Sequence, residues 1–309
     1  MLVIDNTDAD MKEYLSDKLV RAYVARTNKN MEKNHQTLEM HTLDGIESNL
    51  NVPYTSRDGA QLYMDVYKPA FKPGVKYPVI IYVHGGGLIF GDRTMVNGFG
   101  QMLAARGYIV CAIEFRLVPS VRAYEDMADA SAGYDFAVQY LSEMPDADVS
   151  KVYIASESAG SYLAVYINAM AHSKAFETAV GYKAANMNVR AMALVGGMYY
   201  TGRKDKIGVL KTSYYGKGPK AKAFKPYINP EHKDIISSLP PSLLITSKAD
   251  FLKKYSKKYS KALQKNNIEY KLYDFGRDKR LTHAFPLIHP DYPESTVAAE
   301  IIDDWFKTH

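Results

Sequence analysis

Six short apolar runs, rich in valine and isoleucine, recur along the chain from residue 78 onward. Strands that are apolar on both faces are typical of a parallel sheet covered by helices on both sides. Helical patterns lie between several of the runs, for example over Ala123–Leu141 and Ala159–Ala171. This alternation predicts an α/β fold with a mostly parallel central sheet and helices on both faces. The runs are Pro78–Val83, Tyr108–Ile113, Val152–Ala155, Ala191–Val195, Ser242–Thr246 and Glu269–Tyr273.

Other periodic patterns flank this region. Apolar residues recur every four positions over residues 10–28, which predicts an amphipathic helix. Residues 29–50 are polar and irregular. Val52–Thr55 and Gln61–Tyr67 then alternate on either side of an Asp-Gly pair, which predicts a β-hairpin. A final amphipathic helix is predicted over Glu294–Lys307.

These patterns divide the chain into an N-terminal helical cap segment, residues 1–50, and a main α/β domain, residues 51–309. The interval 198–238 has no clear period and is too long for an ordinary connection, so we expect an insertion that serves as a lid. Aromatic side chains in the cap and the lid either line a substrate site or pack the lid itself. Together with Met11 of the cap, they are Tyr14 of the cap and Tyr199, Tyr200, Tyr214, Tyr215 and Tyr227 of the insertion.

Composition narrows the class of protein. With 309 residues, 47% hydrophobic and 24% charged, the chain is neither disordered, collagen-like nor a coiled coil. Its single cysteine, Cys111, excludes an intrachain disulfide and a cysteine-rich metal site. No secretory signal or membrane-length apolar stretch is visible, so a cytoplasmic protein is expected. A leader removed ahead of Met1 would leave no trace.

The net charge of +5 is unevenly distributed. The segment Phe251–Lys265 carries +6 and the segment Arg203–Lys225 carries +7, so the rest of the chain carries −8. The first segment predicts an amphipathic helix with a lysine stripe opposite an apolar face. No nucleic-acid-binding motif accompanies either segment, and a nucleic-acid or membrane-surface role is therefore set aside. The basic lid segment suggests a preference for anionic substrates. The predicted apolar face comprises Phe251, Leu252, Tyr255, Tyr259 and Leu263.

The strongest candidate for a nucleophile follows the third apolar run. Ligands of such sheets bind beyond the carboxyl ends of the strands, and the run leads into Ser-Glu-Ser-Ala-Gly at residues 156–160. This is a variant of the G-x-S-x-G nucleophile elbow, with Ser156 in place of the first glycine. Ser158 would stand at the tip, and the amide of Ala159 would donate to an oxyanion at the helix N-terminus. An ordinary serine-rich turn is the alternative.

A glycine-rich loop follows the first apolar run. It reads His84-Gly85-Gly86-Gly87. Glycines allow a close backbone approach, and we expect the N–H groups of Gly86 and Gly87 to complete an oxyanion hole. We expect His84, with Gly85, to shape the loop. A phosphate-binding loop is disfavoured because the G-x-G-x-x-G spacing and a Gly-Lys-Ser/Thr sequence are both absent.

Together, these motifs resemble the hormone-sensitive-lipase-like esterase branch of the α/β-hydrolases. The segment Glu114–Pro119 resembles the family's Asp-Tyr-Arg-Leu-Ala-Pro, and Tyr124-Glu125-Asp126 follows it. Phe115 and Val118 are mild departures, and Ser120 stands where the family usually has glutamate. The resemblance runs from about residue 52 to the C-terminus. It implies an α/β-hydrolase fold and activity on small esters that falls as the acyl chain lengthens.

In α/β-hydrolases the acid and the base follow the nucleophile in the order Ser, Asp or Glu, His. Asp250 comes after the fifth apolar run, where the triad acid of the family lies. His283 stands in Leu-Thr-His-Ala-Phe, which resembles the family's His-Gly-Phe. The weaker alternatives are Asp234 and Asp274 for the acid and His289 and His309 for the base.

We therefore expect a serine carboxylesterase, in which Ser158 attacks an ester, His283 acts as general base and Asp250 orients the histidine. This chemistry needs no metal or organic cofactor, and the expected partner is a small-molecule ester. Cleavage of an amide, a formamide or a thioester is not distinguished by the sequence. A ligand-binding homologue with a disused triad is a further alternative. Homodimer formation is left open.

Overall fold

The fold is built on one central sheet. The computed structural model describes residues 17–22, 25, 43–276 and 278–309. Its strands are β1 (Ile46–Thr55), β2 (Gln61–Pro69), β3 (Tyr77–Val83), β4 (Ile109–Ile113), β5 (Ala147–Glu157), β6 (Val189–Val195), β7 (Ser242–Thr246) and β8 (Tyr270–Asp274). They form an eight-stranded sheet in the order β1-β2-β4-β3-β5-β6-β7-β8. The pairs β1–β2 and β2–β4 are antiparallel, and all the others are parallel.

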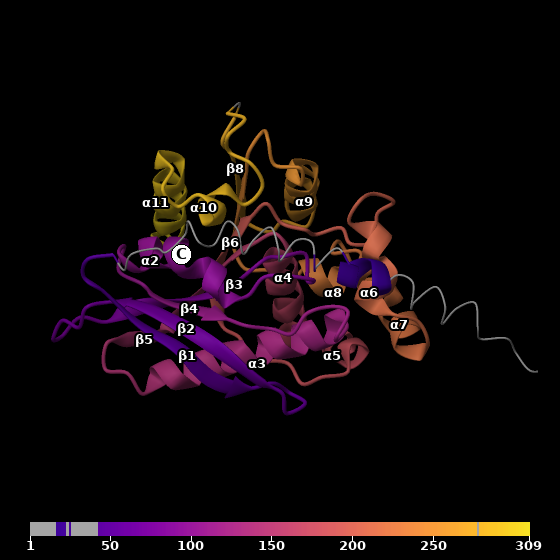
Figure 1. Ribbon diagram of the computed structural model, residues 1–309, viewed down its shortest axis with the longest axis horizontal. Coiled ribbons are helices and arrows are strands. Elements are labelled where there is room, and N and C mark those ends of the chain that lie inside the picture. The colour runs from indigo at the N-terminus through magenta and orange to yellow at the C-terminus, as the bar shows by residue number, and fades with distance from the viewer. Residues whose placement is uncertain (1–16, 23–24, 26–42, 277) are drawn as a thin grey trace, which may run out of the picture.

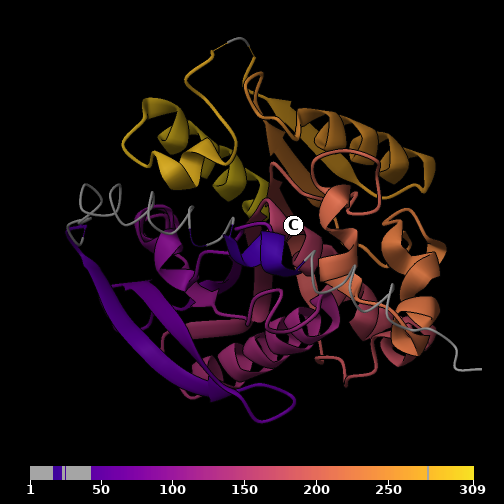
Figure 2. The same ribbon diagram turned by 45° about the vertical axis from the view of Figure 1, so that its right-hand side comes forward.

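Helices cover both faces of the sheet (Figures 1 and 2). The longer ones are α2 (Asn97–Ala104), α3 (Ala123–Ser142), α4 (Ala159–His172), α9 (Lys253–Lys265) and α11 (Pro293–Lys307). Apolar residues of α3, α4 and α9 belong to one hydrophobic core, and those of α2 and α11 belong to a second core on the opposite face. The predicted α/β architecture is therefore confirmed. Shorter helices are α5 (Lys174–Val180) and α10 (Phe285–Ile288).

The N-terminal hairpin is longer than its hydrophobic pattern suggests. β1 begins at Ile46 rather than at Val52, so the expected boundary at residue 50 falls inside a strand. The pairing with β2 shifts register between Asn49 and Val52, and Asn51 lies at φ 61°. Such a bulge interrupts the alternation of side chains between the two faces. The first half of the strand therefore lacks the two-residue period that would have predicted it.

A short helical piece of the N-terminal segment packs against the main domain. Residues 17–22 and 25 are helical, and the rest of the predicted helix 10–28, with Met11 and Tyr14, lies outside the described residues. Asp17 forms an ion pair with Arg122 at 3.0 Å, and Arg122 also donates to the carbonyl of Ser213 at 2.8 Å. Arg122 thus joins this piece to the start of α3 and to the insertion.

The insertion between β6 and β7 consists of short helices, with α6 (Lys211–Tyr215), α7 (Pro219–Phe224) and α8 (Lys233–Ile236) as its α-helices. Its tyrosines are largely internal. The ring of Tyr199 stacks on that of Tyr259 at 4.1 Å, and Tyr200 and Tyr214 are buried. The contacts favour the interpretation that these aromatic residues pack the insertion. That the insertion serves as a lid stays a prediction.

The lysine-rich helix α9 starts later than predicted, at Lys253. Leu252, Tyr255 and Tyr259 are buried as expected, but the placement of Phe251 on the buried face is wrong, because its side chain is 63% exposed. Phe251 belongs to the turn before the helix, so the helical period does not apply to it. In that turn the Leu252 amide donates to the Asp250 carboxylate at 2.8 Å.

Candidate functional site

Ser158 occupies the sharp turn between β5 and α4. Its backbone has φ 52° and ψ −116°, a region that a residue with a Cβ seldom adopts. Two hydrogen bonds hold the turn: the Ser158 amide donates to the Val195 carbonyl at 2.8 Å, and the Met198 amide donates to the Ser158 carbonyl at 2.9 Å. Both partners belong to the end of β6 and the residues after it. The neighbouring strand therefore fixes a strained backbone that presents the Ser158 hydroxyl.

Three side chains from distant parts of the sequence form a continuous hydrogen-bonded chain. His283 Nε2 lies 2.8 Å from Ser158 Oγ, and His283 Nδ1 lies 2.7 Å from Asp250 Oδ1. A carboxylate only accepts, so Nδ1 carries the hydrogen and donates to Asp250. In the neutral ring Nε2 is then left as the acceptor for the Ser158 hydroxyl. The structure thus brings together the three residues that the sequence predicted as nucleophile, acid and base.

Asp250 is held as a carboxylate. Burial by itself would raise the pKa of Asp250, but hydrogen bonds from His283, the Leu252 amide and the Thr246 hydroxyl, with the attraction of His283, hold that pKa below its usual value. Thr246 Oγ1 donates to Asp250 Oδ2 at 2.8 Å. Each carboxylate oxygen therefore has a donor, which fixes the orientation of the group toward His283.

His283 lies in the loop between β8 and α10. Ala284 follows it in the left-handed region, at φ 52°. The exposed ring of Phe251 lies against the imidazole, with ring centroids 4.4 Å apart. The periodicity of the sequence had assigned Phe251 to the core, so this contact was missed.

The glycine loop approaches the nucleophile closely. Gly86 has φ 100°, and a Cβ built on it would lie 1.8 Å from the Phe90 carbonyl oxygen. A Cβ on Gly160, in the first turn of α4, would lie 2.0 Å from the Val83 carbonyl oxygen at the end of β3. Neither position tolerates a side chain without movement of the backbone. Within the described residues, the amides of Gly86, Gly87 and Ala159 donate to no acceptor, which leaves them free for an oxyanion.

A buried acid, Glu157, ties the loop to the nucleophile turn. The Gly85 amide donates to Glu157 Oε1, so this amide is engaged and is not available to a substrate. Burial raises the pKa of Glu157 to about 8, and the Gly85 hydrogen bond offsets only part of that rise. No role was predicted for Glu157 from the sequence. The feature that could have identified it is its position, since a charged residue stands at the end of an apolar strand, directly before the nucleophile.

His84 is a neutral, buried residue at the start of the loop. Its Nδ1 donates to the Gly85 carbonyl at 2.9 Å, and its ring stacks on Phe115 with centroids 4.2 Å apart. Burial lowers the pKa of His84 to about 4. Phe115 belongs to the segment after β4, where Arg116 forms an ion pair with the buried Asp129 at 2.8 Å. His84 therefore packs against a neighbouring segment that is held in place by the Arg116–Asp129 ion pair.

The alternative acids and bases have other contacts. Asp274 forms ion pairs with Lys253 and Lys257 of α9 at 2.8 and 3.3 Å. His289 stacks on Tyr292, and His309 forms a contact with Glu269. Asp234 lies at the start of α8, where its amide donates to the side chain of His232.

The described part of the chain contains neither a metal-binding cluster nor a membrane-spanning helix. It contains no group of three or more His, Cys, Asp or Glu residues placed to hold a metal ion. Of its helices, none is both long and apolar enough to cross a bilayer. A cytoplasmic location stays a prediction.

Comparison with protein families gives two matches. The family described as having the alpha/beta hydrolase fold matches residues 80–287. The carboxylesterase family matches residues 12–120, a region that includes the glycine loop.

Two curated relatives are each 26% identical to the chain over the part that aligns. A probable isoprenylcysteine alpha-carbonyl methylesterase of Arabidopsis thaliana is 26% identical over 238 residues, which are 71% of this chain and 49% of the relative. A carboxylic ester hydrolase of Mycobacterium tuberculosis is 26% identical over 230 residues, which are 71% of this chain and 59% of the relative. The chain therefore spans about half the length of the curated relatives it matches.

Solved structures match over nearly the whole chain. Esterase B of Lactobacillus rhamnosis, inhibited by a tributyrin phosphonate, superposes with a TM-score of 0.83 at 22% identity, covering 96% of this chain and 95% of that one. A bacterial heroin esterase superposes with a TM-score of 0.72 at 19% identity, covering 92% and 90%. At 22% and 19% identity, these two matches show similarity of fold.

The raised pKa of Glu157 predicts a loss of stability with rising pH. The folded protein holds its proton up to about pH 8, whereas the ordinary pKa is 4.5. The unfolded chain therefore binds fewer protons between these values, and the free energy of unfolding falls by about 1.4 kcal/mol per pH unit there. Glu157→Gln removes this dependence, so its stability relative to the wild type should improve as pH rises.

Urea unfolding at several pH values between 5 and 8 measures the effect. The exposed Glu143 serves as the matched control, since Glu143→Gln makes the same chemical change outside the core. Parallel pH dependences for the wild type and Glu157→Gln would contradict the assignment.

Proposed function

Because the chain belongs to the alpha/beta hydrolase fold family, as its sequence predicts, we propose that it is a serine carboxylesterase acting on short-acyl esters of small molecules. The observation that carries the proposal is the hydrogen-bonded chain from Asp250 through His283 to Ser158. The names of relatives point the same way, since one is a carboxylic ester hydrolase and a structural neighbour is an esterase. We further propose that the catalytic domain, which the sequence predicts over residues 51–309, begins with β1 at Ile46 and extends to residue 309.

In the first step Ser158 Oγ attacks the ester carbonyl while His283 Nε2 takes the hydroxyl proton. The ring becomes an imidazolium, and the adjacent Asp250 carboxylate stabilises its charge. His283 then returns the proton to the alcohol oxygen as the C–O bond breaks, which leaves an acyl-enzyme. In the second step His283 takes a proton from water as the water attacks the acyl carbon, and it then gives this proton to Ser158 Oγ as the C–O bond to the acyl group breaks and the acid is released.

The oxyanion of each tetrahedral intermediate would be bound by the amides of Gly86, Gly87 and Ala159. These donors are part of the backbone and are already oriented, so they cost little reorganisation during the reaction. Ala159 is the first residue of α4, and the positive end of the helix dipole adds to its effect. No metal or organic cofactor is required by this sequence of steps.

The second candidate is a related acyl transfer, cleavage of an amide, a formamide or a thioester. The same three side chains and the same donors would serve it, because the tetrahedral intermediates are alike. A ligand-binding protein with a disused triad is the remaining alternative. Covalent labelling by a fluorophosphonate separates that alternative from both kinds of hydrolase, since it requires a reactive Ser158.

Ser158→Ala should abolish ester hydrolysis, with a loss of roughly 10⁴–10⁶-fold in kcat, because the nucleophile is removed. The control is Ser256→Ala, which makes the same change at a buried serine of α9 far along the chain. Steady-state kinetics with para-nitrophenyl butyrate provide the measurement, and urea unfolding checks that both variants fold. Full turnover in Ser158→Ala would overturn the proposal.

Asp250→Asn should lower kcat by about 10⁴-fold, because an amide stabilises neither the required tautomer nor the imidazolium. Asp274→Asn is the matched control, since Asp274 pairs with lysines rather than with His283. Its kcat should be unchanged. A large loss in Asp274→Asn with none in Asp250→Asn would reverse the assignment of the acid.

The short-acyl preference is tested with para-nitrophenyl acetate, butyrate, octanoate and laurate. We expect kcat/KM to fall steadily beyond butyrate. A maximum at laurate would refute the acyl preference while leaving the reaction type intact, and cleavage confined to the matching anilides would favour an amidase.

A further inference from the structure

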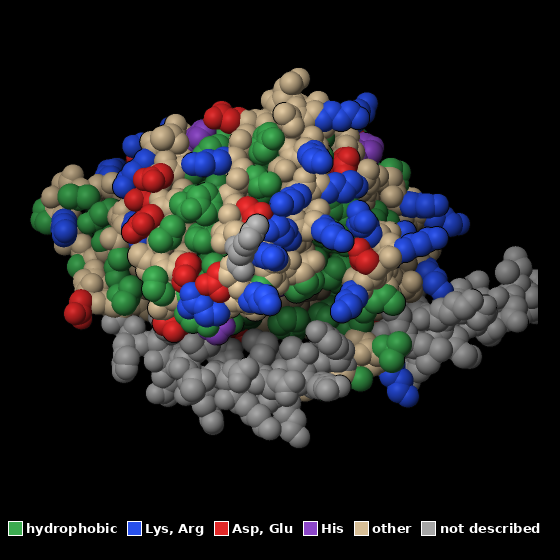
Figure 3. Space-filling view, turned by 90° about the horizontal axis from the view of Figure 1, so that it is seen from above, with side chains coloured by type: hydrophobic (Ala, Val, Ile, Leu, Met, Phe, Trp, Pro, Cys, Tyr) green, Lys and Arg blue, Asp and Glu red, His purple; other side chains and the backbone are tan. Residues whose placement is uncertain are grey.

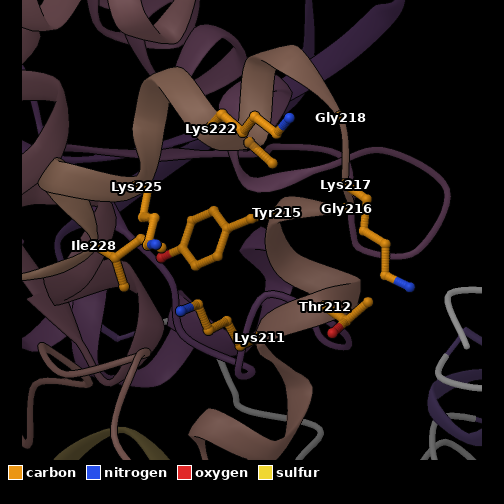
Figure 4. Close-up of a pocket in the computed structure, with 10 residues that line it drawn as sticks. Lys211, Thr212, Tyr215, Gly216, Lys217, Gly218, Lys222, Lys225 and Ile228 are labelled. Atoms are coloured by element: carbon orange, nitrogen blue, oxygen red, sulfur yellow. The ribbon is translucent and has the colours of Figure 1, made fainter. Parts of the chain in front are cut away.

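The insertion contains a pocket of about 450 Å³, formed by α6, α7 and the 3₁₀ turn η3 (Lys225–Ile228) (Figure 4). Its floor includes the buried side chains of Tyr215 and Ile228. Four of its lining residues are exposed lysines, which surround that floor. They are Lys211, Lys217, Lys222 and Lys225. None of the triad residues lines this pocket.

Among the described residues, three of the four lysines that line the pocket have no ion-pair partner. No carboxylate is among the described residues that line it. Lys211, Lys222 and Lys225 form no ion pair with any residue that the structure describes, whereas the neighbouring Lys220 pairs with Glu125 at 3.1 Å. Some lysines of α9 are paired as well, Lys253 and Lys257 with Asp274 and Lys258 with Glu231 at 2.9 Å. Like charges gathered around one cavity repel each other, and an anion bound among them would relieve that repulsion.

The space-filling view agrees with this distribution. Figure 3 shows one face of the molecule, seen from above relative to Figure 1. Lysine and arginine side chains predominate on the side of this face where α9 and the insertion lie, while acidic and basic groups are mixed on the other side.

The floor of the pocket offers an apolar surface. The hydroxyl of Tyr215 is engaged in the interior, with Thr201 Oγ1 at 2.6 Å and the Tyr162 hydroxyl at 2.9 Å. The phenol is therefore anchored, and its ring is what a ligand would contact. Figure 4 shows the amino groups of Lys211 and Lys225 beside Tyr215. A ligand with an apolar body and an anionic head would match both parts of the lining.

We propose that this pocket is a binding site for a small organic anion, an aromatic or aliphatic body that bears a carboxylate or a phosphate. The volume is within the range of small-molecule sites. The site is distinct from the triad, because its lining contains neither a triad residue nor a residue of the glycine loop. The proposal therefore does not depend on the proposed hydrolysis.

Calorimetric titration of the full chain with benzoate, benzamide and phenyl phosphate tests the proposal. Benzoate and benzamide have nearly the same shape and differ in charge. We expect benzoate to bind, benzamide to bind at least tenfold more weakly, and the Kd of benzoate to rise with salt concentration. Tighter binding of phenyl phosphate would identify phosphate as the preferred head group, and tighter binding of benzoate would identify carboxylate. Equal binding of benzoate and benzamide would overturn the proposal.

The double variant Lys211→Gln/Lys225→Gln should weaken benzoate binding by roughly tenfold, the effect of two partly exposed ion pairs. The matched control Lys254→Gln/Lys261→Gln removes the same charge from exposed positions of α9 and should leave the Kd unchanged. An equal loss in both variants would show only a general attraction of the basic surface and would overturn the site. Ser158→Ala should bind benzoate like the wild type, which separates this test from that of the proposed reaction.

Discussion

The geometry of the site depends on one strained turn, the passage from β5 into α4 at Ser158. A residue with a Cβ held in this backbone region costs about 1–3 kcal/mol, which the surroundings must offset. Here the offset comes from the end of β6, which hydrogen-bonds to both the amide and the carbonyl of Ser158. The buried strand and the helix packed behind it supply further stabilisation. The hydroxyl is therefore presented by a turn that is hydrogen-bonded to the central sheet and the residues that follow β6.

The same turn requires that α4 begin very close to β3. Gly160 lies against the Val83 carbonyl with no room for a Cβ, and Val83 leads directly into the glycine loop. Glu157, one residue before Ser158, accepts a hydrogen bond from Gly85 in that loop. Ser158 and the loop that carries the proposed oxyanion donors are therefore positioned by each other. Burial of Glu157 favours its protonated form, so the group that accepts the hydrogen bond from Gly85 carries no charge.

The insertion combines a firmly packed interior with an unbalanced surface. Its tyrosines stack on α9 and hydrogen-bond toward α4, which anchors short helices that would have little stability alone. Three of its lysines, Lys211, Lys222 and Lys225, in contrast, line a pocket with an apolar floor and have no carboxylate partner among the described residues. A net charge of +5 for the whole chain conceals this local arrangement, because the rest of the molecule is acidic.

The sequence by itself determined the order of strands and helices, and it indicated Ser158, Asp250 and His283, because each follows an apolar run at the carboxyl end of a parallel strand. Local patterns failed where tertiary contacts override them. The bulge at Asn51 hid the first half of β1 from the two-residue period. Phe251 does not lie on the predicted apolar face, because it belongs to the turn that holds Asp250 and α9 begins only at Lys253. Only the tertiary structure decided which carboxylate meets the histidine, since that choice depends on the packing of loops from three separate strands. The role of Glu157 was likewise decided there, because burial, which shifts its pKa, is a property of the folded surroundings and not of the residue.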